Sequence, residues 1–142
     1  MDRIKYRKMA SFSFFLLILS QFSGSAFSQY SLEIEISGIR NNQGVIMIQL
    51  LNSTQEVVDQ EKGVIKDDSC VVTFTNLAPS KYAIQYYQDE NLNEKLDKNK
   101  LGIPTEGYGF SNDAYGMFGP KPFKYWLFDL NSDKKVALRI KY

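Results

Sequence analysis

Apolar side chains at every second position constrain the fold of this chain more than any other feature of its sequence. Leu32, Ile34 and Ile36 alternate with polar residues, and the same spacing returns from Val45 to Leu50. A period of two is typical of a β-strand that buries one face. The short polar sequence RNNQG between the two segments predicts a hairpin that pairs them.

More strand patterns follow along the chain. A short strand is predicted near 63–66, and the β-branched and aromatic segments 70–77 and 78–88 are predicted to be neighbours in an antiparallel sheet. Segments 124–131 and 134–142, joined by the sequence NSD, predict a last hairpin. About seven strands without a helical pattern favour an all-β fold. We expect a single antiparallel β-sandwich, transthyretin-like or Ig-like, with one long ordered loop.

The first 28 residues have the pattern of a secretory signal peptide. A basic start precedes the apolar run Phe12 to Leu19, and small residues follow at 23–28. The run is shorter than the roughly 20 residues of a membrane-spanning helix, and the basic flank disfavours a buried helix. We expect cleavage after Ala26 or Ser28, export to the periplasm or the cell exterior, and no membrane span afterwards. Because Cys70 is far from that position, no lipid anchor is expected.

Residues 29–142 would remain as the mature chain, which is long enough for one domain and marginal for two. It would carry 13 basic and 15 acidic residues, a net charge of about −2 that offers no basic field for nucleic acid. The single cysteine, Cys70, cannot form an internal disulfide, and the chain has no histidine to activate it. Cys70 is therefore predicted to be a core residue.

A long segment without periodicity separates the strand that ends near Gln88 from the one that begins near Lys124. Compact domains rarely contain such a loop unless it is functional, disordered or tied down. Its many apolar residues argue against disorder. These are Leu96, Leu101, Ile103, Tyr108, Phe110, Tyr115, Met117 and Phe118. We therefore expect specific interactions to order this loop.

The start of the loop has the ligand spacing of a calcium site. Calcium prefers six to eight oxygen ligands, and acidic loops supply them from positions one, three, five and nine, with a backbone carbonyl at seven. The matching residues are Asp89, Asn91, Asn93, Lys95 through its carbonyl, and Asp97. Position six is Glu94 instead of glycine and position twelve is Lys100 instead of Glu, which excludes a full EF-hand. Glu106 or Asp113 is expected to supply a later carboxylate.

Three other interpretations of this region stay open. The Asp and Asn side chains of a solvated turn would only satisfy local backbone donors. Under the calcium interpretation, by contrast, Asp89 and Asp97 are expected to contact only water when no metal is bound. Asp97 and Glu106 would be the two acids of a carboxylate-dependent hydrolase. The glycine- and aromatic-rich segment 107–123 would form a protein-interaction surface that needs no metal. There, Gly107 and Gly109 predict positive φ or close backbone approach, with Tyr108 or Phe110 packed on the sheet.

The same stretch resembles a family of secreted bacterial proteins, the domain of unknown function 2141. The matching positions are Asp89, Glu90, Asn91, Asn93, Leu96, Asp97, Gly102, Pro104, Glu106, Gly107, Tyr108, Gly109, Phe110, Ser111, Asn112, Gly119, Pro120 and Phe123. Where relatives often have a histidine and a glycine, this chain has Gln88 and Glu94. The resemblance implies an exported β domain and names no substrate. The turn before Tyr82, with Ser80 in place of glycine, also resembles transthyretin-like and carboxypeptidase-regulatory-like modules.

Together these features predict an exported, non-catalytic binding or structural module of the bacterial envelope, with a calcium-binding Asp/Asn loop. Its partner would be an envelope or extracellular protein or a glycan. The chain lacks a nucleophilic serine motif and a phosphate-binding glycine loop, so the sequence favours a module without enzymatic activity.

Overall fold

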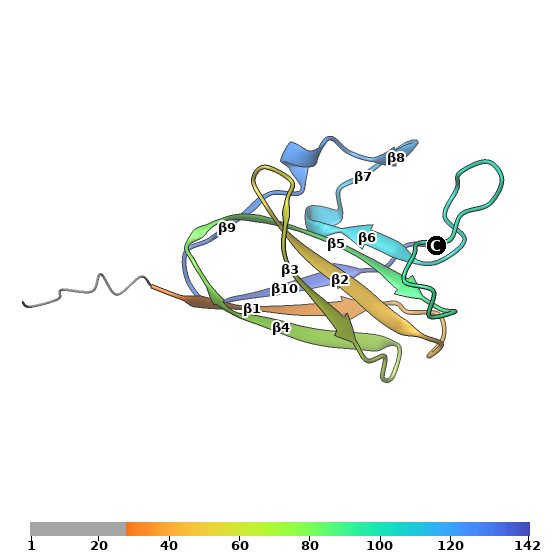
Figure 1. Ribbon diagram of the computed structural model, residues 1–142, viewed down its shortest axis with the longest axis horizontal. Coiled ribbons are helices and arrows are strands. Elements are labelled where there is room, and N and C mark those ends of the chain that lie inside the picture. The colour runs from red at the N-terminus through yellow and green to blue at the C-terminus, as the bar shows by residue number, and fades with distance from the viewer. Residues whose placement is uncertain (1–27) are drawn as a thin grey trace, which may run out of the picture.

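Two β-sheets, packed face to face, form the body of the molecule in the computed structural model, which describes residues 28–142 (Figure 1). The first sheet has the order β10-β1-β4 and the second β3-β2-β5-β6, with β9 also paired to β5. The six longer strands are β1 (Tyr30–Ser37), β2 (Val45–Asn52), β3 (Val57–Gly63), β4 (Ser69–Leu77), β5 (Ser80–Asp89) and β10 (Lys134–Arg139). The shorter elements are β6 (Tyr108–Phe110), η1 (Ser111–Asp113), β7 (Tyr115–Gly116), β8 (Gly119–Pro120), η2 (Phe123–Tyr125) and β9 (Phe128–Leu130). The predicted all-β sandwich is confirmed.

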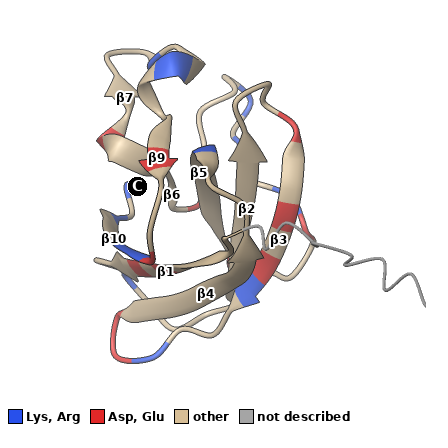
Figure 2. Cartoon of the chain, turned by 90° about the vertical axis from the view of Figure 1, so that its left-hand side faces the viewer, with Lys and Arg blue, Asp and Glu red and all other residues tan. Residues whose placement is uncertain are grey.

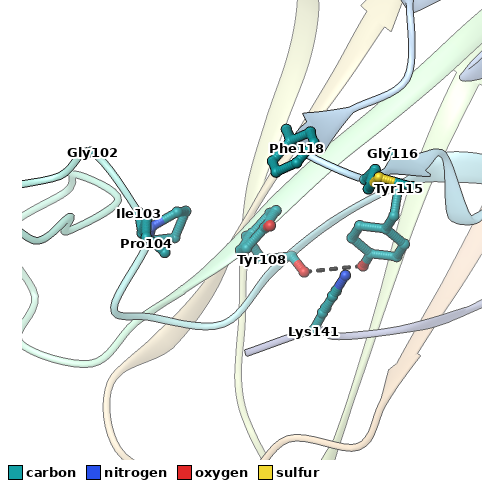
Figure 3. Close-up of a pocket in the computed structure, with 10 residues that line it drawn as sticks. Gly102, Ile103, Pro104, Tyr108, Tyr115, Gly116, Phe118 and Lys141 are labelled. Atoms are coloured by element: carbon teal, nitrogen blue, oxygen red, sulfur yellow. Dashed lines mark hydrogen bonds between the residues drawn. The ribbon is translucent and has the colours of Figure 1, made fainter.

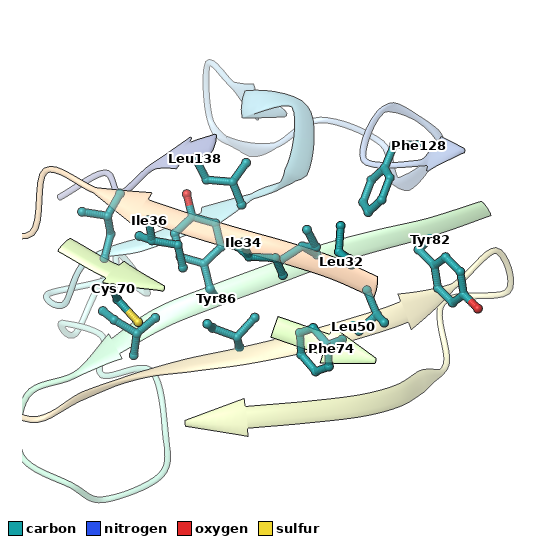
Figure 4. Packing of buried hydrophobic residues seen from close by; sticks show 14 of the residues in the cluster. Leu32, Ile34, Ile36, Leu50, Cys70, Phe74, Tyr82, Tyr86, Phe128 and Leu138 are labelled. Carbon is teal, nitrogen blue, oxygen red and sulfur yellow. The ribbon is translucent and has the colours of Figure 1, made fainter. Parts of the chain in front are cut away.

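The core between the sheets is built from the alternating residues that the sequence pattern identified. Leu32, Ile34 and Ile36 of β1 are fully buried, as are Ile46 and Leu50 of β2. Figure 4 shows them interleaved with side chains of β4, β5 and β10. Burial of each such side chain contributes about 1.5–3 kcal/mol, so the period-two pattern supplies much of the driving force for the sandwich.

The three predicted hairpin or neighbour pairings are wrong. β1 and β2 lie in different sheets, β4 pairs with β1 while β5 pairs with β2, and β9 pairs with β5 while β10 pairs with β1. Each short connection therefore crosses from one layer to the other instead of joining neighbours in one sheet. Alternation shows which face of a strand is buried. Two consecutive strands bury the same residues whether they pair in one sheet or lie in opposite sheets, so alternation does not decide between these arrangements.

The crossing from β4 to β5 shows how local chemistry holds such a connection. Asn76 takes a positive φ of 59°, and the Tyr82 hydroxyl donates to the Ala78 carbonyl at 2.9 Å. Pro79 has no N–H to offer a hairpin ladder. The predicted antiparallel arrangement also has one exception, because β10 lies parallel to β1.

Strand β3 forms an edge of the second sheet and occupies 57–63, earlier than the strand predicted near 63–66. Every residue of β3 except Gly63 is exposed, so it lacks the alternation that marks a half-buried strand. Its Asp59, Glu61 and Lys62 place charges along the edge (Figure 2). Charged edge strands resist pairing with other chains.

The predicted core role of Cys70 is confirmed. It is a buried free thiol on β4, and a Cβ at Gly63 would lie 2.1 Å from its sulfur. Burial raises the pKa of the Cys70 thiol to about 11. The thiolate needed for nucleophilic chemistry is therefore scarce at neutral pH.

The predicted signal peptide falls on residues 1–27, outside the described part of the chain, and its cleavage stays a prediction. Among residues 28–142, no helix has the length and apolar character needed to cross a membrane.

Candidate functional site

The Asp/Asn loop, residues 89–97, begins where β5 ends and hangs from one end of the sandwich (Figure 1). Asp89 is 1% exposed, and its two carboxylate oxygens accept the backbone N–H groups of Asn93 at 3.0 Å and Glu94 at 2.9 Å. The expectation that Asp89 contacts only water is therefore wrong. A buried carboxylate that accepts two N–H groups holds the first turn of the loop closed.

The other predicted side chains converge on Asp97. Asn91 donates through Nδ2 to one oxygen of Asp97 at 2.6 Å, and Asn93 donates to the other at 3.0 Å. Asn91 Oδ1 and Asn93 Oδ1 accept the backbone N–H groups of Asn93 and Lys95 at 3.1 and 2.9 Å. The structure thus joins Asp89, Asn91, Asn93 and Asp97 in one hydrogen-bonded cluster. The position of the Lys95 carbonyl as a ligand stays a prediction.

The backbone of the loop is sharply curled at two positions, and the second of them is the sixth position of the calcium spacing. Leu92 and Glu94 have positive φ values of 59° and 61°. The sixth position of a calcium loop normally takes glycine because the turn is sharp. Glu94 takes the left-handed conformation there although it is not glycine, and its carboxylate is held by Lys62 at 2.6 Å.

Glu106 returns from further along the chain to close the loop. Its two carboxylate oxygens accept the N–H groups of Glu90 and Asp97, each at 2.9 Å. Glu106 is buried, so these bonds fix both ends of the loop to one point. The alternative residue, Asp113, lies in η1, where its charge acts on Tyr86 and Tyr115. The structure therefore brings Glu106 to the loop and places Asp113 elsewhere.

The atoms predicted to bind the metal are all oxygens of carboxylates, side-chain amides or a carbonyl, as a hard cation requires. In the described part of the chain, no three His, Cys, Asp or Glu side chains are grouped so as to hold a metal. A cation beside Asp97 would depend on the amide oxygens of Asn91 and Asn93, which in this structure accept the backbone N–H groups of Asn93 and Lys95. The cluster supplies oxygen atoms of the type that calcium prefers, and calcium binding by this loop stays a prediction.

Two polar residues support the loop from behind and were not identified from the sequence. Gln88 is fully buried, and its amide donates to the carbonyls of Asn41 and Gln43 at 3.1 and 2.9 Å. The Tyr142 hydroxyl donates to the Gln88 side-chain oxygen. A glutamine on the apolar face of a strand was the available signal, since a buried amide needs partners.

The glycine- and aromatic-rich segment is held against β5. A Cβ at Gly109 would lie 2.2 Å from the Tyr86 hydroxyl, so close backbone approach explains this glycine. Tyr108 and Phe110 are half-buried. The centre of the Phe110 ring lies 4.2 Å from the centre of the Trp126 ring. The predicted packing of Tyr108 or Phe110 against the sheet is confirmed.

A second apolar cluster orders the rest of the long segment. Ala114 and Trp126 pack on Leu51 and Ala83, which face away from the main core. The predicted ordering of the long loop is confirmed, and its causes are the Glu106 closure, β6 pairing and this cluster.

These features define an all-β sandwich with an acidic loop at the end of a central strand, closed by a buried glutamate. Residues 34–138 match the sequence model of an uncharacterized protein family conserved in bacteria, DUF2141, and the chain belongs to this family. No curated protein matches the chain.

Proposed function

We propose that this protein is a non-catalytic binding or structural module, exported to the bacterial envelope, whose Asp/Asn loop binds calcium. One observation supports the calcium site above the others. The side chains of Asn91 and Asn93 meet at Asp97, and Asp89 is joined to them through the backbone N–H of Asn93, on a backbone curled at Leu92 and Glu94. This arrangement places the Asp97 carboxylate beside the side chains of Asn91 and Asn93, as the calcium proposal requires.

The hydrogen bonds of Glu106 favour a structural role over hydrolysis. A general acid or base must reach a substrate proton. Both Glu106 oxygens are occupied by backbone N–H groups, and the residue is buried. The absence of histidine from the chain and the raised pKa of Cys70 support the same proposal.

The calcium affinity should be low. The site has two loop carboxylates, Asp89 and Asp97, and no bidentate Glu at position twelve. Sites of this charge in extracellular modules bind with dissociation constants on the order of 10⁻⁴ to 10⁻³ M. The partner we propose is an envelope or extracellular protein or a glycan. The short resemblance to transthyretin-like modules agrees with such an accessory role.

Thermal melting with calcium or chelator tests this function. Calcium that binds only the folded state at about 100 times its dissociation constant would add roughly 2.7 kcal/mol to the free energy of unfolding. Asp97→Asn should abolish the rise in melting temperature, because it removes a carboxylate while the amide keeps one acceptor oxygen. Asp59→Asn, on the exposed edge strand β3, is the matched control and should keep the response. An unchanged wild-type melting curve at about 100 mM calcium, which is about 100 times the highest expected dissociation constant, would favour the polar-turn interpretation.

A further inference from the structure

A cavity of about 420 Å³ lies between the 102–104 segment and the β7–β8 hairpin. Its lining is mostly apolar and aromatic: Ile103, Pro104, Tyr108, Tyr115, Met117 and Phe118, with glycines between them. Figure 3 shows Phe118 and Tyr115 on one side and Ile103 and Pro104 on the other, with Tyr108 between them. Pockets for small ligands have volumes of roughly 300–1,000 Å³ and linings of this kind.

Two residues at the tip of the β7–β8 hairpin are left open to solvent. Met117 is 91% exposed and Phe118 98% exposed. Ile103 is exposed as well, and it lies across the cavity from Phe118 (Figure 3). Single exposed apolar side chains are common on protein surfaces and need no explanation. Exposed apolar side chains that group around one cavity, as these do, indicate a binding site.

The charged groups of the cavity have one sign. Lys141 is the only charged residue in its lining, and its ammonium lies 5.1 Å from the centre of the Tyr115 ring. A neighbouring cavity shares Gly102, Pro104 and Tyr108 with the first and adds Lys98. Neither lining contains a carboxylate, and the ion pairs found among residues 28–142 include neither lysine. Charge complementarity therefore favours an anionic group on the ligand.

We propose that this cavity binds a small amphiphilic anion, with an aromatic or aliphatic body against Phe118 and Ile103 and a carboxylate or sulfonate beside Lys141. This site is separate from the Asp/Asn loop and does not require calcium. The cavity proposal therefore goes beyond the proposed function, and either proposal can be wrong while the other is right.

A matched pair of fluorescent probes tests the proposal. 8-Anilinonaphthalene-1-sulfonate has an aromatic body and a sulfonate, and N-phenyl-1-naphthylamine has the same body without the charge. Wild-type protein should bind the sulfonate at one saturable site. Lys141→Gln should weaken that binding about tenfold, as loss of a hydrogen bond to a charged group does, and leave the neutral probe unchanged. Phe118→Ala should weaken both probes without lowering the melting temperature, because the side chain is exposed.

Two control variants lie away from the cavity, Lys66→Gln and Val64→Ala, both in the β3–β4 connection. They should change neither affinity. Probe binding that Lys141→Gln and Phe118→Ala leave unaltered would overturn the proposal. Co-sedimentation of the protein with vesicles of anionic phospholipid, lost on Phe118→Ala, would also overturn it by assigning the exposed tip to a membrane surface.

Discussion

Ser111 fills a gap along the edge of β5. β6 pairs with Gln85 to Tyr87 and β9 with Ser80 to Tyr82, so the Ile84 N–H between them has no strand partner. The Ser111 hydroxyl accepts this N–H at 2.9 Å and donates to the Trp126 carbonyl at 2.6 Å. One buried hydroxyl thus joins β5 to the segment that covers its outer face.

Ser111→Ala should lower the free energy of unfolding by about 1–3 kcal/mol, because it leaves the buried Ile84 N–H without an acceptor. Urea denaturation measures the change. Ser69→Ala, whose exposed hydroxyl donates to the Lys66 carbonyl, should cost much less. Equal losses for the two variants would contradict the role assigned to Ser111.

The buried thiol of Cys70 makes the free energy of unfolding depend on pH in the alkaline range. Burial raises the pKa of its thiol to about 11 from 9.0. Between these values the folded state holds a proton that the unfolded state has released, so stability falls as pH rises through this window. Tyr86, whose pKa burial also raises, adds in the same direction.

Chemical denaturation at pH 8 and at pH 10.5 should therefore show lower stability at the higher pH. Cys70→Ala should reduce this difference while lowering stability at both pH values, because it leaves a cavity. A pH dependence identical in Cys70→Ala and the wild type would contradict the contribution of the thiol.

At the scale of elements, β6 depends on the close approach of Gly109 to Tyr86. The Tyr86 hydroxyl donates to the Arg139 carbonyl at 3.0 Å, so the ring is held in place. Gly109→Ala would put a methyl group 2.2 Å from that hydroxyl. We expect a loss of about 1–3 kcal/mol, the usual cost of overpacking, together with faster proteolysis within 90–107. Limited proteolysis and thermal melting measure both effects, and wild-type behaviour in both would contradict this packing.

The element scale also shows what the sequence could and could not predict. The alternation at Leu32 to Ile36 and at Val45 to Leu50 identified real strands, and in the first of them it also identified the buried face. It could not assign them to sheets, because a hairpin and a crossing between layers bury the same residues. The sequence placed strand β3 too late in the chain. As an edge strand with almost no buried residues, β3 has no apolar alternation by which to recognise it.

The candidate loop was predictable because its residues are close in sequence. Asp89, Asn91, Asn93 and Asp97 were found from spacing, and Glu106 was one of two later carboxylates, with Asp113, expected to close the site. The supports of the loop were not found, because Gln88 and Tyr142 act through partners distant in sequence. Local patterns predict local geometry, and long-range hydrogen bonds need the fold.

At the scale of the whole molecule, the sandwich gathers its irregular chemistry at one end. Arg40 pairs with Glu90 at 2.8 Å and lies 4.4 Å from the centre of the Tyr142 ring. The C-terminal residues bridge the two sheets there, where Tyr108 and Lys141 exchange backbone hydrogen bonds. A rigid scaffold that holds an ordered loop is suited to binding.

The central claim, calcium binding by the Asp/Asn loop, is tested most directly by nuclear magnetic resonance titration of the folded protein with calcium. The account predicts that the backbone amide resonances of Asn93, Glu94 and Lys95 shift along one saturation curve, with a dissociation constant on the order of 10⁻⁴ to 10⁻³ M. Asp97→Asn should abolish these shifts, and Asp59→Asn should keep them. If those resonances stay fixed up to several millimolar calcium, or shift equally in Asp97→Asn, the loop is a polar turn and the claim is wrong.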